Sequence, residues 1–195
     1  MSQKTNNIEQ KIICAFLENY KAKWHLREIA RKTKISPQTA HRYLNALEMK
    51  NILKTEYVGK NKNFFLNKEN IITKHTVLKS EIEKTSEFLK NHPKIHLILE
   101  QLNPKKAIIF GSYAKSTETK DSDIDMILFE KTSIKKITEL EITYNLEINT
   151  KNTTTNEFKK LLKQDNALAI EVLKNHIIFS GFDDIVNLFW EKYYG

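Results

Sequence analysis

The fold of this chain is decided by residues 107–129, AIIFGSYAKSTETKDSDIDMILF. This stretch begins and ends with short apolar runs, 107–110 and 126–129, and runs of this kind are typical of buried strands. Gly111-Ser112 follows the first run directly. Ten residues later come two aspartates separated by one residue, at the beginning of the second run. The spacing therefore predicts a Gly-Ser turn at the end of one strand and two carboxylates at the start of the next.

The two aspartates, Asp123 and Asp125, share one face of the predicted strand because side chains alternate along a strand. Two negative charges on one face repel each other unless a cation lies between them. Mg²⁺ takes oxygen ligands of this kind and brings the phosphates of a nucleotide with it. Gly111 lets the backbone approach a phosphate closely, and Ser112 can donate a hydrogen bond to it. These residues alone therefore predict a site for Mg²⁺ and a nucleotide.

The segment from Gly111 to Asp125 resembles the DNA polymerase β-type nucleotidyltransferase superfamily, and within it the minimal nucleotidyltransferases. The resemblance covers about residues 104–181 and implies two Mg²⁺ ions and a nucleoside triphosphate substrate, expected to be ATP. The implied metal ligands are Asp123 and Asp125, and the implied nucleotide-binding residues are Gly111, Ser112 and Lys115. Ser116 stands where the superfamily commonly has glycine, and it would be strained if this position requires a positive φ. The alternative interpretation is an N-cap serine and two surface aspartates in a turn.

Superfamily members use a third acid on a neighbouring strand, and the candidate here is Glu147, within a predicted strand over residues 144–149. Leu146 and Ile148 are its neighbours in the strand. Because side chains alternate, both would point to one face and Glu147 to the other. It would act as a third metal ligand or as the base that takes a proton from the attacking hydroxyl. The predicted catalytic set is therefore Asp123, Asp125 and Glu147, and the alternative for Glu147 is an exposed position on an edge strand.

Composition excludes several classes of protein. An apolar share of 40% over 195 residues is enough for one or two domains with ordinary cores. No run of about 18 apolar residues is present, so we expect no membrane-spanning segment. The first seven residues are polar and lack the apolar core of a signal peptide, and the single cysteine cannot form an internal disulfide. A cytoplasmic location is therefore expected.

The net charge of +8 is distributed unevenly along the chain. Residues 1–75 carry 15 Lys and Arg against 6 Asp and Glu, whereas residues 76–195 carry 17 against 18. The basic excess therefore lies entirely in the first part. This asymmetry indicates two domains and favours nucleic acid as a partner of the first one.

The first part of the chain has the pattern of three helices followed by a hairpin. Ser36 is a suitable N-cap for the third helix, and Pro37 fits its first position. The predicted elements are helices over 8–20, 25–32 and 37–51, and strands over 53–58 and 64–66 around a turn at 59–62.

This order of elements resembles a winged helix-turn-helix domain over about residues 8–67. The resemblance implies that the third helix enters the major groove of DNA and that the wing contacts the backbone. The implied base-contacting residues are Gln38, Thr39, His41 and Arg42, and the implied phosphate-contacting residues are Lys60 and Lys62. Winged helices also serve as protein-docking modules, and a polar helix face with a solvated turn would explain the same residues without a ligand.

We therefore expect an α+β protein in three parts. These are a winged helix-turn-helix domain over 1–68, a helical linker over 69–93, and a nucleotidyltransferase domain over 94–195 with a mixed sheet flanked by helices. The linker is expected to be a long helix that supports a homodimer or packs on the wing. A helix over 133–142 is expected to carry Glu139 and Glu141 on its solvated face, and 151–156 is expected to be a polar loop.

The predicted function is Mg²⁺-dependent transfer of a nucleotide monophosphate, expected to be AMP from ATP, to a hydroxyl acceptor. A protein hydroxyl, an RNA end and a small alcohol all stay open as acceptors. By analogy with minimal nucleotidyltransferases, a partner toxin protein is the leading acceptor, with the winged helix binding DNA for autoregulation. The alternatives are a DNA-binding regulator that only senses nucleotide, and an enzyme that modifies RNA ends.

Overall fold

The computed structural model describes the backbone of residues 2–195 and the side chains of residues 8–195. The chain divides into two compact units, one formed by residues 1–80 with 193–195 and the other by residues 81–192. The division falls within helix α4 (Ile71–Asn91) and again near the end of helix α10 (Phe182–Tyr194). No helix among the described residues is long and apolar enough to cross a membrane.

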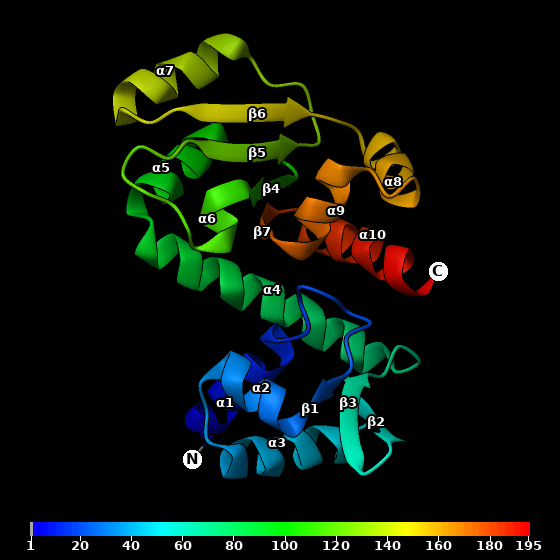
Figure 1. Cartoon of the computed structure of the whole chain (residues 1–195). Coiled ribbons are helices and arrows are strands. Elements are labelled where there is room, and N and C mark those ends of the chain that lie inside the picture. Colours follow the sequence, from blue (N-terminus) through cyan, green and yellow to red (C-terminus); the bar gives the residue numbers. More distant parts are fainter. Residues whose placement is uncertain (1) are drawn as a thin grey trace. The chain divides into compact units, whose positions relative to one another are not determined.

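The first unit combines helices with a small antiparallel sheet of strand order β1-β3-β2 (Figure 1). Its elements before α4 are α1 (Ser2–Cys14), β1 (Trp24–His25), α2 (Leu26–Thr33), α3 (Pro37–Met49), β2 (Leu53–Val58) and β3 (Asn61–Leu66). Three helices followed by a hairpin form the predicted winged helix-turn-helix. The two-residue strand β1 was not predicted, because so short a strand carries no recognisable alternation.

Local sequence sets the ends of these helices. The Ser36 hydroxyl accepts a hydrogen bond from the Thr39 backbone N–H at 3.2 Å, with Pro37 as the first helical residue, so the predicted start of α3 is confirmed. The prediction for the first helix was too long, since α1 ends at Cys14 rather than near Tyr20. Tighter turns follow it, with hydrogen bonds such as Phe16 N to Ile13 O at 2.9 Å.

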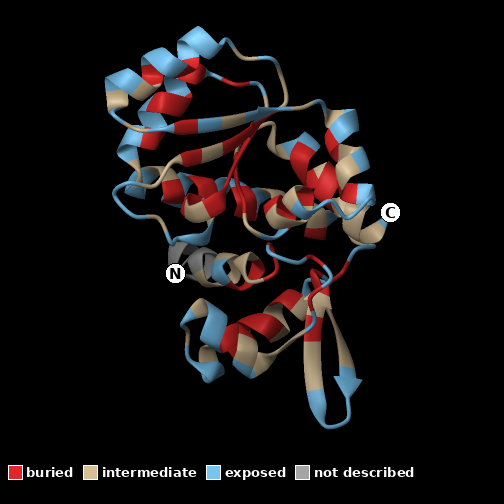
Figure 2. Cartoon of the chain, turned by 45° about the horizontal axis from the view of Figure 1, so that its top comes forward, coloured by how far each residue is buried: buried red, intermediate tan, exposed pale blue. Residues whose placement is uncertain are grey.

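The hairpin turn is shorter than predicted. Val58 pairs with Asn61, and Tyr57 pairs with Lys62, so only Gly59 and Lys60 form the turn. Gly59 has φ +61°, as two-residue hairpin turns require. The tip of this hairpin is exposed (Figure 2). Lys60 therefore lies in the turn, whereas Lys62 lies in strand β3.

The second unit is built on a mixed four-stranded sheet of order β6-β5-β4-β7, in which only β5 and β6 run parallel (Figure 1). Its elements after α4 are α5 (Pro93–Leu102), β4 (Ala107–Phe110), α6 (Gly111–Lys115), β5 (Ile124–Leu128), α7 (Ile134–Tyr144), β6 (Ile148–Asn152), α8 (Thr155–Lys163), α9 (Ala167–Lys174), β7 (Ile177–Ser180) and α10. Helices cover both faces of the sheet. The α+β class and the mixed sheet flanked by helices are confirmed.

Two predicted boundaries around β6 were wrong. Helix α7 continues to Tyr144 and β6 begins only at Ile148, so Glu147 precedes the strand. Lys151 belongs to β6 rather than to a polar loop, because backbone pairing with β5 extends to Asn152. Glu141 is not simply solvated, since its Oε1 accepts a hydrogen bond from the Ile148 backbone N–H at 2.9 Å.

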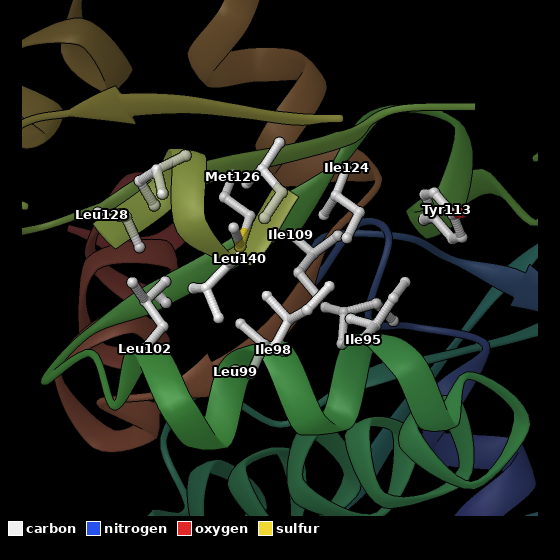
Figure 3. Packing of buried hydrophobic residues seen from close by; sticks show 14 of the residues in the cluster. Ile95, Ile98, Leu99, Leu102, Ile109, Tyr113, Ile124, Met126, Leu128 and Leu140 are labelled. Atoms are coloured by element: carbon white, nitrogen blue, oxygen red, sulfur yellow. The ribbon is translucent and has the colours of Figure 1, made fainter. Parts of the chain in front are cut away.

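One face of this sheet packs against α5 and α7 (Figure 3). Ile124, Met126 and Leu128 alternate along β5 and point into this cluster. The α5 residues that meet them and Ile109 are Ile95, Ile98, Leu99 and Leu102, all buried. Because alternate residues of a strand face opposite sides, the Asp125 side chain lies on the other face, which α8, α9 and α10 cover.

A buried polar cluster joins the second half of α4 to the segment before β7. Glu81 and His176 are fully buried side by side, with Oε1 and Nε2 3.0 Å apart, and the Lys84 ammonium lies 3.4 Å from Glu81 Oε2. Burial by itself would raise the pKa of Glu81, but the charges of Lys84 and His176 outweigh it and hold the pKa at about 2. Glu81 is therefore ionised in the fold and stabilises it wherever the unfolded chain, with a pKa of 4.5, would also be ionised.

We predict that Glu81→Gln lowers the free energy of unfolding at pH 7 by about 3 kcal/mol, because it removes the buried counter-charge of the Lys84 ammonium. The difference from wild type should shrink as the pH falls from 4.5 towards 2, where the native carboxylate becomes protonated. Urea unfolding at several pH values measures this. Glu87→Gln, an exposed change on the same helix, is the control. A difference that does not vary with pH in this window would contradict the assignment.

Candidate active site

The Gly-Ser segment and the second aspartate are in direct contact. Phe110, the last residue of β4, pairs with Asp125 of β5, so the next residue, Gly111, lies against the Asp125 carboxylate. A Cβ atom at Gly111 would lie 2.2 Å from Asp125 Oδ2, and Gly111 has φ +71°. Both the space and the backbone conformation therefore require glycine here. The two halves of the sequence motif come together in space, as predicted.

The Ser112 hydroxyl is an unsatisfied group in the first turn of α6. Its Oγ is buried and has no hydrogen-bond partner among the described residues. Leaving a buried hydroxyl unpaired costs about 1–3 kcal/mol. This arrangement is typical of a group whose partner arrives with a ligand, and it favours the predicted role of Ser112 in holding a phosphate.

The aspartate pair has a neighbour that the sequence reasoning did not single out. Asp123 lies just before β5, and its Oδ2 accepts a hydrogen bond from the Asn149 side-chain amide. Asn149 also pairs in register with Asp125 across the parallel strands β5 and β6. Three polar side chains therefore gather on one face of the sheet. Asn149 could have been noticed as the residue two positions beyond Glu147, but an amide gives no charge signal.

The pKa of Asp125 is shifted by several charged groups on this face of the sheet. Burial raises the pKa of Asp125, and the charges of Asp123 and Glu171 raise it further, while Lys151 and Lys115 partly oppose them. Glu171 comes from α9, on the covered side of the sheet. Sequence alone gave no signal for Glu171 or Lys151, because their proximity depends on how α9 and β6 pack. Lys151 and Lys115 therefore offset only part of the negative charge around Asp125.

The structure does not bring the third predicted acid into this group. Glu147 is exposed, and its backbone oxygen accepts a hydrogen bond from Ile124 N at 2.9 Å. Within residues 8–195 no three Asp, Glu, His or Cys side chains lie close enough together to hold a metal ion. Glu147 flanks Asp123 through the backbone, and its role as a ligand or base stays a prediction.

The third helix of the first unit presents part of its predicted nucleic-acid face to solvent. Gln38, His41 and Arg42 are exposed, and the Arg42 guanidinium lies 4.8 Å from the centre of the Tyr43 ring. Thr39 differs, because it is only partly exposed and its Oγ1 accepts a hydrogen bond from the Ser36 hydroxyl at 2.8 Å. Three of the four predicted base-contacting side chains are therefore available, and Thr39 helps to cap the helix.

The two wing lysines are in different situations. Lys60 lies exposed in the hairpin turn and forms no ion pair with any described residue. The Lys62 ammonium lies 2.6 Å from Glu48 Oε2, on the last turn of α3, and its hydrogen bond lowers the pKa of Glu48. Glu48 therefore neutralises Lys62 in the free protein. Nothing in the sequence distinguishes the two lysines, because Glu48 and Lys62 are 14 positions apart in the chain and their contact depends on the fold.

Comparison with known proteins identifies both units. Residues 83–183, more than half of the chain, match the family described as polymerase beta, nucleotidyltransferase. The chain belongs to the polymerase β-type nucleotidyltransferase family. Residues 5–54 match the family described as winged helix-turn-helix DNA-binding. Both resemblances predicted from sequence motifs are thus confirmed.

Named relatives match the second unit. Two putative protein adenylyltransferases from Methanocaldococcus jannaschii are each 32% identical over 93 residues, which is 43% of this chain and 93% of each relative. A crystal structure described as a toxin-antitoxin with AMP-PNP aligns with 53% of this chain and with 83% of the solved chain. The two are 18% identical, and the TM-score is 0.34. A superposition this loose supports no conclusion about either protein. The curated relatives agree with the family in making this chain a nucleotidyltransferase.

Ser116, the departure from the nucleotidyltransferase pattern, does occupy the position that favours glycine. It ends α6 in the left-handed conformation, with φ 55° and ψ 41°. A residue with a Cβ atom in this region costs about 1 kcal/mol relative to glycine. This strain is local, since the backbone N–H of Ser116 still bonds to the helix. The motif therefore keeps its shape at a small loss of stability.

The donor set fits the Mg²⁺ that this family implies. Carboxylate and amide oxygens are hard ligands of the kind that Mg²⁺ prefers. Burial and the neighbouring charge of Asp123 both raise the pKa of Asp125, and a bound cation would counter both effects. Asp123 and Asp125 are the residues that would hold it, with Asn149 orienting Asp123. The chain thus provides two carboxylates for the metal among its described residues.

We predict that Asp125→Asn raises the melting temperature of the metal-free protein at pH 7 by about 2 °C, because it removes a like-charge repulsion without changing the side-chain shape. The native pKa lies above the unfolded value of 3.8, so ionised Asp125 destabilises the fold at neutral pH. The gain should therefore disappear below pH 3.8. Thermal unfolding in EDTA measures it, with exposed Asp121→Asn as the control. An equal rise for both changes, or a lower melting temperature for Asp125→Asn, would contradict this account.

Proposed function

We propose that the second unit transfers AMP from ATP to a hydroxyl group of another protein, and that the first unit binds duplex DNA. The contact between Gly111 and Asp125 carries the proposal for the second unit, since it joins the phosphate-binding turn to the metal-binding acids. The identity of the nucleotide and the protein nature of the acceptor are supported by the names of the two archaeal relatives. A partner toxin as that acceptor stays a prediction.

The proposed mechanism assigns each group a task. Ser112 and Lys115 hold the β- and γ-phosphates of ATP, while Asp123 and Asp125 hold Mg²⁺. When bound, the metal neutralises negative charge on the α-phosphate and on the departing pyrophosphate. The acceptor hydroxyl oxygen forms a bond to the α-phosphorus as the bond to the pyrophosphate oxygen breaks. Glu147 is the proposed base for the hydroxyl proton.

The arrangement of Asp123, Asp125 and Asn149 supports the proposal that these groups bind metal without a large rearrangement. Asp123 is held by Asn149, and Asp125 is held by strand pairing and by its contact with Gly111. Groups fixed before the substrate arrives lose little freedom on binding, which favours the transition state.

We predict that the chain transfers label from [α-³²P]ATP, but not from [γ-³²P]ATP, to protein in lysate of its source cells when Mg²⁺ is present. Asp123→Asn with Asp125→Asn should reduce transfer by a factor of about 10³, because the removed charges act on the transition state. Asp121→Asn, in the loop before the pair, serves as the matched control. If adding the chain increases labelling only from the γ position, or if calorimetry detects no ATP binding, the proposed reaction is excluded.

Two results would favour the alternative functions. Label that appears on RNA ends rather than on protein would make this an RNA-modifying nucleotidyltransferase. ATP binding without any transfer, in any mixture, would favour a regulator that senses nucleotide. In both outcomes the site binds ATP, and only the reaction that follows differs from the proposal.

DNA binding by the first unit is proposed from the winged helix match, the exposed face of α3 and the basic excess of residues 1–75. Gln38, His41 and Arg42 would meet base edges in the major groove. Lys60 would meet a phosphate, and Lys62 would do so only by leaving Glu48. The two wing lysines should therefore contribute unequally.

We predict that Lys60→Ala weakens binding to all duplexes alike and lowers the slope of log affinity against log salt by about 1. Glu48→Gln should strengthen binding by about threefold, because it frees Lys62 and removes a negative charge near the phosphates. Fluorescence anisotropy at several salt concentrations measures both. Lys163→Ala, which removes the same charge from α8, is the control. Equal effects of the Lys60 and Lys163 changes would argue against DNA contact by the wing.

A further inference from the structure

A lysine of the nucleotide-binding turn is already paired with an acid. The Lys115 ammonium lies 2.5 Å from Glu171 Oε1, and the two residues come from α6 and α9. Both side chains are more than a third exposed, at 40% and 37%. The contact therefore lies at the open edge of the site rather than in the core.

The pair lies within electrostatic reach of the aspartates. Lys115 is four residues after Gly111 on α6, so both lie on the same side of that short helix, and Gly111 contacts Asp125. The charges of Glu171 and Lys115 also act on Asp125 with opposite signs. Lys115 and Glu171 thus border the Gly111–Ser112 turn, where the proposed function places the triphosphate.

A second cation near Asp125 provides a contrast. Lys151 lies on β6, two residues beyond Asn149 on the same face, and acts on Asp125 in the same direction as Lys115. In the part of the chain that the structure describes, its ammonium has no ion-pair partner. Glu171 therefore neutralises one of the two cations and leaves the other free.

We infer that Glu171 competes with the phosphates of bound nucleotide for Lys115, so that this ion pair opens when nucleotide binds. The inference rests on the proposed function, since it assumes that a triphosphate occupies the site. Glu171 then lowers nucleotide affinity and makes it depend on a carboxylate outside the sequence motif.

The exposure of the pair limits the size of this effect. Ion pairs exposed to this degree contribute little, and opening this one should weaken nucleotide binding by no more than about fivefold, which corresponds to about 1 kcal/mol. A competition of this size adjusts affinity without preventing binding. It is large enough to be measured by calorimetry.

The experiment is a double-mutant cycle on nucleotide binding. The dissociation constant of the non-hydrolysable analogue α,β-methylene-ATP with Mg²⁺ is measured for wild type, Glu171→Gln, Lys115→Met and the double variant. Glu171→Gln should tighten binding by about threefold to fivefold. Lys115→Met should weaken it by about tenfold, and in that background Glu171→Gln should have almost no effect.

Lys151→Met supplies the matched control, because it removes the same charge beside Asp125 from a lysine that does not pair with Glu171. In the Lys151→Met background, Glu171→Gln should still tighten binding by the full factor. If Glu171→Gln tightens binding equally in all backgrounds, Glu171 acts only through its long-range charge and the inference is wrong. If Glu171→Gln weakens binding, Glu171 positions Lys115 for the phosphates, which also overturns it.

The outcomes distinguish the inference from the function on which it rests. No binding of the analogue by the folded wild-type chain would remove the proposed function itself. If the analogue binds but the effects of Glu171→Gln and Lys115→Met on binding free energy are additive, the proposed function stands. Only the competition for Lys115 is then disproved. All of these substitutions are at exposed or partly exposed positions, so circular dichroism should report folded protein throughout.

Discussion

The close approach of Gly111 to the Asp125 carboxylate is the constraint on which the second unit depends. It fixes where β4 ends, places α6 beside β5, and leaves no room for a side chain at residue 111. The sheet core on the opposite face supports this contact, because Ile109 and Met126 pair there and are fully buried. Packing on one face thus holds together the polar groups on the other.

In both units, a lysine that we propose to bind phosphate is paired with an acid. Lys62 of the wing is paired with Glu48, and Lys115 of α6 is paired with Glu171. In each case the acid comes from a different element and lies at the edge of the surface that would receive phosphate. Pairing limits unfavourable repulsion among cations before a ligand arrives, and it also lowers affinity. Lys60 and Lys151 lack ion-pair partners among the described residues and contrast with both.

The features that could be predicted are those that depend on residues close together in the sequence. Strand β4 was predicted to the residue because an apolar run ends at a glycine, and the start of α3 followed from Ser36-Pro37. Features that depend on the register between distant segments were missed, including Asn149 beside Asp123. The turn after Val58 was predicted too long, because Asn61 and Lys62 look like loop residues although they pair across the hairpin.

The repulsion between Asp123 and Asp125 has a consequence for how long the protein persists in a cell. A ligand that binds only the folded chain adds to its stability in proportion to the logarithm of its concentration above the dissociation constant. Metal and nucleotide at this site would relieve the repulsion between the two carboxylates. Proteolytic turnover of this chain would then depend on cellular nucleotide supply, independently of any reaction that it catalyses.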